Sequence, residues 1–333
     1  MLDTHKGRML SFGIMADTPP TDPQTPRPLP RRPVSRPPSP ARANRPRFGA
    51  TDAAWIVLLC LVSLALSAWM GEMAGRRLGG SLAAAGTVAA LYALGWRARD
   101  RAAGVSAGLL AAASPQFLFL AAYSPQSALF ALLTTAALFA FVAGSSLAAL
   151  ALAAGAAIVR PDGVLLGLLL LALSAAQQRR RTGIGAALFS VPIAAYMTGR
   201  FALGHGLPLL PVFGLHGGVW RWLWTPASGL LVWLLLPFCG EWGEPQRRAR
   251  WLPVVLWLGV SLLSASAESV TTPSGMLLPV LPLVFALAGG GLSRLLPTLA
   301  GESPRPALRY LLAAAAVLVL VGLHLRLEPD FSK

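Results

Sequence analysis

The turn Arg160–Gly163, which reads Arg-Pro-Asp-Gly, joins two apolar runs and brings a guanidinium and a carboxylate close together in the chain. The proline ends the first run because it cannot continue a helix, and the glycine frees the backbone for the second. Arg160 could clamp a phosphate through its planar fork, and Asp162 could accept a proton as a general base. The structural alternative is an arginine that extends to lipid headgroups, or a surface ion pair that stabilises by about 0 to 1 kcal/mol.

Four other segments place polar side chains at the ends of apolar runs. Charge at the end of a membrane helix is costly, so such residues are candidates for a site. For each residue alone, a helix-end position without a function is an equally simple interpretation. The candidates are Glu72, the turn Tyr123–Ser127 with Gln126, the loop Arg200–Thr225 with His205 and Arg221, and Glu268.

The loop Arg200–Thr225 also carries two histidines and three tryptophans. A stretch of this kind suits an amphipathic segment lying in the membrane interface, although the aromatic rings could alternatively form a platform for a sugar. No acid or cysteine accompanies the histidines at a ligand spacing, so no metal site is predicted. A cofactor is left open, with a divalent cation as one option. These side chains are His205, His216, Trp220, Trp222 and Trp224.

The elements that must position these residues are long apolar runs separated by short polar breaks. A helix needs about 20 apolar residues to cross the hydrocarbon, and the runs lack the alternation of a membrane barrel. The sequence therefore predicts an all-α integral membrane protein with about eleven transmembrane helices. The predicted spans are Ala53–Met70, Gly79–Trp96, Ala102–Tyr123, Ser127–Val142, Ser146–Val159, Gly163–Ala176, Gly183–Thr198, Ala227–Cys239, Trp251–Ser266, Met276–Gly290 and Tyr310–Leu325.

Arginines gather in alternate loops, which predicts the orientation of the chain. With the N-terminus in the cytoplasm, the loops on that side hold most of the arginines, as the positive-inside rule requires. The C-terminus and the site candidates then lie on the outer side. The cytoplasmic arginines are Arg97, Arg99, Arg101, Arg179, Arg180, Arg181, Arg247, Arg248, Arg250, Arg294, Arg305 and Arg309.

Composition supports a membrane protein with a basic tail. The chain is 55% hydrophobic and 12% charged, far from the roughly 25% charged residues of soluble domains. Its net charge of +15 does not indicate nucleic acid, because a basic face with interleaved aromatics is missing. Residues 1–50 form a predicted disordered cytoplasmic tail rich in proline and arginine, and 51–333 a multi-pass domain. The tail is either attracted to anionic headgroups or a proline-rich ligand for a partner domain.

A series of short motifs between Gly79 and Leu295 carries a family resemblance. In these motifs the chain resembles the GT-C superfamily of polytopic glycosyltransferases, which use polyprenyl-phosphate sugars. Within it, the chain is similar to the bacterial arabinofuranosyltransferase-like and mannosyltransferase-like branch. The motifs are Ser114-Pro115, the segment Ala122–Phe130, the turn Arg160–Gly163, Gly204-His205-Gly206-Leu207-Pro208, the segment Thr225–Leu230 and the segment Pro273–Pro282.

The chain departs from the family pattern where the family keeps its acids. The long first outer loop, which bears the family's catalytic acid, is reduced here to Gly71–Arg77. The acid after the third helix corresponds to Gln126, and glutamine cannot take a proton. The aspartate and arginine expected before the last motif are replaced by residues around Val270 and Met276. Carboxylates that could substitute for the missing base are Glu72, Asp162 and Glu268.

The resemblance implies transfer of a sugar from a polyprenyl-phosphate donor to a cell-envelope acceptor outside a bacterial cytoplasmic membrane. Asp162 or Glu72 is the expected base, and Arg160 is expected to bind the phosphate. A catalytically degenerate relative that serves as a membrane subunit or scaffold is the alternative. A transporter or flippase ranks third, since the apolar runs are almost bare of charge. Further expected substrate contacts are Gln126, Tyr123, His205, Arg221 and Glu268.

Overall fold

The computed structural model describes residues 48–73, 78–177, 182–203, 212–213, 243–265 and 273–300, together with Ala315. Internal contacts divide the chain into Met1–Arg47 and Phe48–Lys333, and every described residue belongs to the second unit. The predicted tail lies outside the described residues, as do the predicted spans Ala227–Cys239 and, apart from Ala315, Tyr310–Leu325.

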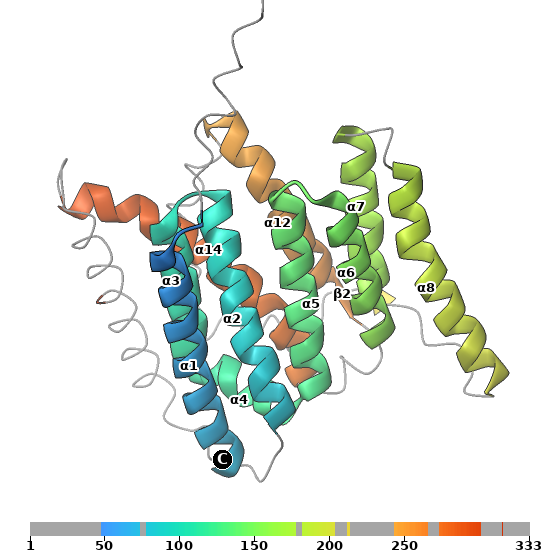
Figure 1. Cartoon of the computed structure of the whole chain (residues 1–333), viewed down its shortest axis with the longest axis horizontal. Helices are drawn as coiled ribbons and strands as arrows, with labels where there is room; N and C mark the ends of the chain where they lie inside the picture. The colour runs from blue at the N-terminus through green and yellow to red at the C-terminus, as the bar shows by residue number, and fades with distance from the viewer. Residues whose placement is uncertain are drawn as a thin grey trace, which may run out of the picture. The chain divides into compact units, whose positions relative to one another are not determined.

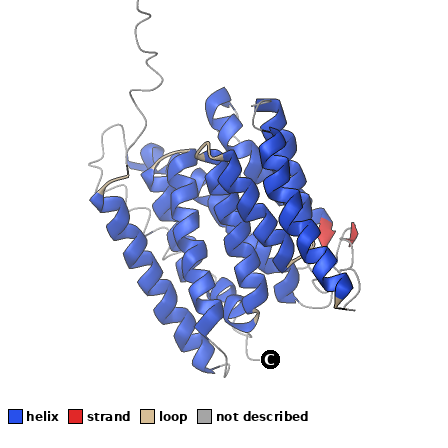
Figure 2. Ribbon diagram, turned by 45° about the vertical axis from the view of Figure 1, so that its right-hand side comes forward, coloured by secondary structure: helices blue, strands red, loops and turns tan. Residues whose placement is uncertain are grey.

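Helices account for nearly all of the described chain (Figures 1 and 2). Two strands of two residues each form a small antiparallel pair, in which Val212 lies opposite Ala265 and Phe213 opposite Ser264. The elements are α1 (Ala50–Met73), α2 (Leu78–Ala98), α3 (Arg101–Ala113), α4 (Pro115–Tyr123), α5 (Pro125–Val142), α6 (Ser146–Val159), α7 (Gly163–Gln177), α8 (Thr182–Ala202), β1 (Val212–Phe213), α12 (Pro245–Leu263), β2 (Ser264–Ala265) and α14 (Pro273–Ala300).

Several described helices could span a membrane. Three are long and apolar enough to do so alone, namely Pro125–Val142, Thr182–Ala202 and Leu277–Leu295, and the bent pair α3 and α4 would make a fourth. The segments 50–66, 146–159 and 163–177 are apolar but shorter. The prediction of an all-helical chain with apolar, membrane-length helices is thus confirmed in its general form. The count of eleven spans is not confirmed and stays a prediction.

The predicted span Ala102–Tyr123 is wrong as a single helix. The structure breaks it at Ser114 into α3 and α4, which are bent by 61° relative to each other. Pro115 occupies the first turn of α4, where its missing N–H costs no hydrogen bond, and the Ser114 hydroxyl caps the same helix by accepting from the Phe117 N–H at 3.3 Å. Ser114 is extended, because the α conformation is disfavoured before proline. The run is apolar on both sides of Ser114-Pro115-Gln116, and its total length of 22 residues suits a single span, so length alone did not reveal the break.

Glycines allow α3 to approach both α2 and α14 at backbone distance. A Cβ added at Gly104 of α3 would lie 2.5 Å from the Tyr92 carbonyl oxygen of α2. A Cβ added at Gly289 of α14 would lie 2.7 Å from the Ala107 nitrogen of α3. Small residues drive such close packing where apolar side chains gain little from leaving lipid. The three helices therefore form the tightly packed centre of the described structure.

Helices α14 and α8 differ sharply in burial although both are apolar. Within the apolar stretch of α14 that could span a membrane, 94% of the residues are buried in the protein, whereas in that of α8 only 11% are buried. Figure 1 shows α8 at one edge of the set of helices and α14 passing behind α2 and α5. Large apolar side chains are exposed on α8, among them Ile184, Val191 and Phe201. Such a face is suited to lipid contact.

Contacts between turns define two opposite ends of the helices. At one end, which we call the arginine end, the side chain of Arg101 contacts Asp52 at 2.8 Å, and that of Arg250 approaches the Arg97 carbonyl oxygen at 3.4 Å. At the other, which we call the turn end, the Gln126 amide donates to the Val159 carbonyl oxygen at 3.0 Å. The predicted grouping of Arg97, Arg101 and Arg250 on one side agrees with these contacts.

Candidate functional site at the turn end

Arg160 and Asp162 form a buried ion pair at the turn between α6 and α7. A guanidinium nitrogen of Arg160 donates to Asp162 Oδ2 at 2.5 Å, and each residue is only 5% exposed. The surface ion pair considered from the sequence, and an Arg160 that extends to headgroups, are both wrong for this reason. Removing one partner of a buried pair costs about 3 to 5 kcal/mol, because the remaining charge is left without compensation.

The local sequence dictates the shape of this turn. Arg160 adopts an extended conformation, with φ −147° and ψ 137°, because Pro161 follows it. The Arg160 N–H still closes the last turn of α6 by donating to the Ala156 carbonyl at 2.9 Å. The Arg160 carbonyl then accepts from the Gly163 N–H at 3.0 Å. Asp162 thereby stands just before the first residue of α7, where the helix dipole favours a negative charge.

Gly163 has no room for a side chain. A Cβ at this position would lie 2.4 Å from the Ala157 nitrogen and 2.5 Å from the Ala156 carbonyl carbon, both of α6. These are backbone atoms and cannot rotate away. The start of α7 is thus pressed against the last turns of α6, and this contact holds Asp162 beside Arg160.

Helix α5 contacts Arg160 and the residue immediately before it. The Arg160 guanidinium carbon lies 4.7 Å from the centre of the Phe130 ring, a cation–π geometry. Phe130 is 1% exposed, so the ring forms a rigid wall against the guanidinium. Gln126, one α-helical turn earlier, donates its amide to the Val159 carbonyl, which is one of the carbonyls left free at the end of α6. The amide therefore fastens α5 to the residue immediately before Arg160.

Asp162 is the chemically distinctive member of the group. Its Oδ2 is held by Arg160, whereas its buried Oδ1 has no hydrogen-bond partner among the described residues. A buried acceptor left unpaired costs about 1 to 3 kcal/mol, and native proteins rarely leave one without a role. An oxygen in this state can accept a hydrogen bond or a proton from a hydroxyl group. An ion pair that only stabilised the turn would not require this unpaired oxygen.

Tyr123 and its neighbours form the second turn at this end. Tyr123 closes α4, is 45% exposed, and stacks on Phe119 with ring centres 6.3 Å apart. The Ser124 hydroxyl donates to the Ser127 hydroxyl at 2.9 Å across the start of α5. Since Gln126 lies in the same turn and contacts α6, the structure brings this turn beside the Arg160–Gly163 turn.

Half of the predicted site residues can be placed. Tyr123, Gln126, Arg160 and Asp162 all lie at the turn end. Glu72 belongs to the last turn of α1, but its side chain lies outside the described residues. His205, Arg221 and Glu268 also lie outside the described residues. In the part of the chain that the structure describes, no three acids, histidines or cysteines come together as a metal site would require.

Two residues with buried polar or cation–π contacts were not predicted from the sequence: Phe130 at the turn end and Asp52 at the arginine end. Phe130 enters the sequence motifs only as the end of the segment Ala122–Phe130, although its position four residues after Gln126 places both on one face of α5. Asp52 stands directly before the predicted first span, Ala53–Met70, and is not among the predicted site residues. It is fully buried and accepts hydrogen bonds from the Tyr92 hydroxyl and Arg101, each at 2.8 Å. The available signal was a carboxylate at the start of an apolar run, with arginines in the next loop on the same side.

Comparison with known proteins adds no relative to this description. No protein-family model, no curated protein and no solved structure matches the chain.

Proposed function

We propose that this protein is a GT-C-like glycosyltransferase that moves a sugar from a polyprenyl-phosphate donor to a cell-envelope acceptor, with Asp162 as the general base. The observation that supports this role is the state of the Asp162 carboxylate. One oxygen is held by Arg160, while the other is buried and has no donor among the described residues. The carboxylate is thus oriented by Arg160, and its second oxygen still has an unused capacity to accept a hydrogen bond or a proton.

In the proposed reaction, Asp162 Oδ1 accepts the proton of an acceptor hydroxyl as that oxygen forms a bond to the sugar C1. The bond between C1 and the phosphate oxygen breaks, and the lipid phosphate leaves with both electrons through a transition state of oxocarbenium character. Arg160 orients the carboxylate and supplies positive charge beside the site where negative charge develops. Because Arg160 is fixed between Asp162 and Phe130, this charge needs little reorganisation during the reaction.

The proposed setting is a bacterial cytoplasmic membrane, with the N-terminus in the cytoplasm and the C-terminus outside. The arginine end would then face the cytoplasm and the turn end the outer side, where a lipid-linked donor is used. The convergence of Arg97, Arg101 and Arg250 at one end supports this orientation through the positive-inside rule. A reporter fused after Lys333 should be active only outside. Cytoplasmic activity of that reporter would reverse the orientation.

Sugar transfer in isolated membranes tests the catalytic proposal, with a polyprenyl-phosphate sugar as donor and expression measured in parallel. Asp162→Asn should lower transfer at least about 100-fold, the usual contribution of a general base. Arg160→Lys keeps the charge but loses the planar fork, and it should also lower transfer. The matched control is Arg101→Lys, which alters an arginine paired with a buried aspartate at the opposite end. Full transfer by both turn variants would place the site elsewhere.

A non-enzymatic membrane subunit is the second candidate, and one observation favours it. Gln126, which stands at the position of a family acid, uses its amide to hold the Val159 carbonyl and so acts as a structural fastener. Absence of transfer by the wild-type chain with every donor tried, combined with co-purification of a stable partner, would support this role over catalysis.

A further inference from the structure

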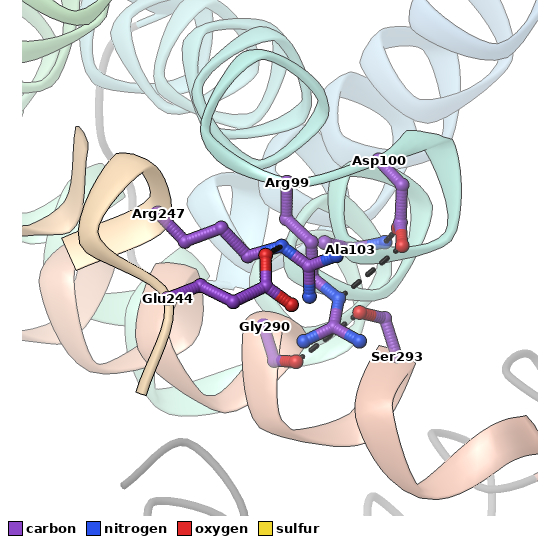
Figure 3. A network of polar contacts seen from close by, with 7 residues as sticks. All are labelled: Arg99, Asp100, Ala103, Glu244, Arg247, Gly290 and Ser293. Carbon is purple, nitrogen blue, oxygen red and sulfur yellow. Dashed lines mark hydrogen bonds and ion pairs between the residues drawn. The ribbon is translucent and has the colours of Figure 1, made fainter. Parts of the chain in front are cut away.

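A dense group of arginines occupies the arginine end, away from the proposed catalytic turn. It is built by three segments far apart in the chain: the turn between α2 and α3, the start of α12 and the last third of α14. Figure 3 shows Arg99 from the first segment and Arg247 from the second extending toward one another above Ser293 of α14. The described arginines of this end are Arg97, Arg99, Arg101, Arg247, Arg248, Arg250 and Arg294.

The described carboxylates at this end are too few to neutralise the arginines. Asp52 pairs with Arg101 at 2.8 Å, Asp100 with Arg99 at 3.2 Å, and Glu244 with Arg247 at 2.9 Å. These three pairs use all three described carboxylates of this end. Three further arginines, Arg248, Arg250 and Arg294, are exposed and form no ion pair with a described carboxylate.

The arginines are close enough to repel one another. Burial lowers the pKa of Arg99, Asp100 opposes this by raising it, and the positive charges of Arg247 and Arg294 lower it again. The side chain of Arg99 is 9% exposed, so little water screens these charges around it. The fold holds α2, α12 and α14 together here in spite of that repulsion. A bound anion would relieve it.

We propose that the exposed arginines Arg248, Arg250 and Arg294 form a binding site for the phosphate headgroups of anionic phospholipids. The planar guanidinium matches the geometry of phosphate oxygens, and two separate segments, the start of α12 and the last third of α14, present it at one end of apolar helices. At that place the membrane surface is the nearest source of phosphate. Basic pockets between helix ends are recognised sites for such headgroups. The site does not depend on the glycosyltransferase proposal, because it lies at the opposite end.

The test uses the purified full chain in mixed micelles of an uncharged detergent with phosphatidylglycerol, phosphatidylcholine or no lipid, and in micelles with added inorganic phosphate. Thermal unfolding is recorded as a function of lipid content. Phosphatidylglycerol should raise the Tm in a saturable manner, whereas phosphatidylcholine and inorganic phosphate should not. The variant Arg248→Gln/Arg250→Gln/Arg294→Gln should need roughly 100-fold more anionic lipid for the same shift, about fivefold for each arginine removed.

Arg200→Gln is the matched control. It removes an arginine near the C-terminal end of α8, whose first turn packs near the start of α6 and whose last turn is therefore remote from the cluster. It should leave the lipid dependence unchanged. An equal Tm shift in the triple variant and the wild type would overturn the proposal, and so would an equal shift with inorganic phosphate. If the triple variant fails to fold, the test is the Tm shift of the wild type with phosphatidylglycerol in about 1 M salt. The salt should abolish the shift if it rests on headgroup charge, and a shift that persists would overturn the proposal.

Discussion

Each end of the helices buries an aspartate against an arginine, and the two pairs differ in how completely the carboxylate is satisfied. Asp52, at the arginine end, accepts from Arg101, from the Tyr92 hydroxyl and, at 2.9 Å, from the Gly49 N–H. Asp162, at the turn end, accepts from Arg160 and keeps Oδ1 without a donor among the described residues. Arg101 is also 42% exposed at its side chain, whereas Arg160 is 6% exposed.

The Asp52–Arg101 pair joins three helices, whereas the Arg160–Asp162 pair carries the unpaired oxygen on which the proposed catalytic role rests. Asp52 links α1 to both α2 and α3, and each of its two carboxylate oxygens has at least one donor. The Asp162 carboxylate accepts fewer hydrogen bonds than it could, because Oδ1 has no donor among the described residues. The residue is 5% exposed, so water is largely excluded from it. Eight buried side-chain atoms among the described residues lack a hydrogen-bond partner, and Asp162 Oδ1 is the one that belongs to a carboxylate, for which an unpaired buried oxygen is most costly.

Asp162→Asn should produce the largest effect on stability. It leaves the Arg160 charge buried and without its carboxylate, which costs about 3 to 5 kcal/mol in the free energy of unfolding. Thermal unfolding in detergent, compared with the wild type, measures the loss as a fall in Tm.

The double variant Arg160→Met/Asp162→Leu sharpens this result. Replacing both charges by apolar side chains of similar size should restore much of the stability lost in Asp162→Asn, because no uncompensated charge remains. Sugar transfer should stay at least as low as in Asp162→Asn. Recovery of transfer together with stability would show that the pair serves packing alone.

Gly163→Ala should come next, with a loss of about 1 to 3 kcal/mol from overpacking. The added Cβ meets backbone atoms of α6, so the turn must open and Asp162 must shift away from Arg160. Gly199→Ala in α8 is the control, since a Cβ there meets nothing within 4 Å. Equal Tm values for the two variants would contradict the close contact.

Asp52→Asn should cost less, about 1 to 2 kcal/mol, although Asp52 is fully buried. The asparagine oxygen can take the place of Oδ2 and accept from the Gly49 N–H, while its NH₂ group donates to the Tyr92 hydroxyl, which can also accept. The partly exposed Arg101 can turn to solvent. Sugar transfer per folded molecule should not change. A loss of stability larger than that of Asp162→Asn would break the distinction between the two ends.

Gln126→Ala should have the smallest effect, about 1 kcal/mol or less, because it removes one exposed hydrogen bond to the Val159 carbonyl. Gln126→Glu should be destabilising to a similar degree, since a carboxylate cannot donate to a carbonyl. Both changes are measured by Tm. A gain of transfer in Gln126→Glu would instead favour the interpretation of Gln126 as a lost acid.

Much of the helical organisation could be predicted from the sequence, because apolar runs must become helices in lipid whatever surrounds them. The ends of α5, α6 and α7 lie at or close to the predicted bounds for this reason, set by Ser-Pro and Arg-Pro-Asp-Gly turns. The break at Ser114 was not predicted. A proline in an apolar run can kink a span or end it, and the outcome depends on the helices that it packs against.

For the candidate site, too, some features follow from the local sequence and others only from the tertiary structure. Residue types and spacing alone determined that Arg160 and Asp162 would share a turn between two helices, since proline and glycine leave that backbone little choice. Only the tertiary structure decided that the turn is buried, that Phe130 and Gln126 of α5 press against it, and that Asp162 keeps one oxygen open. Burial and hydrogen-bond satisfaction depend on neighbours distant in the chain, and a local sequence pattern carries no information about which neighbours those will be.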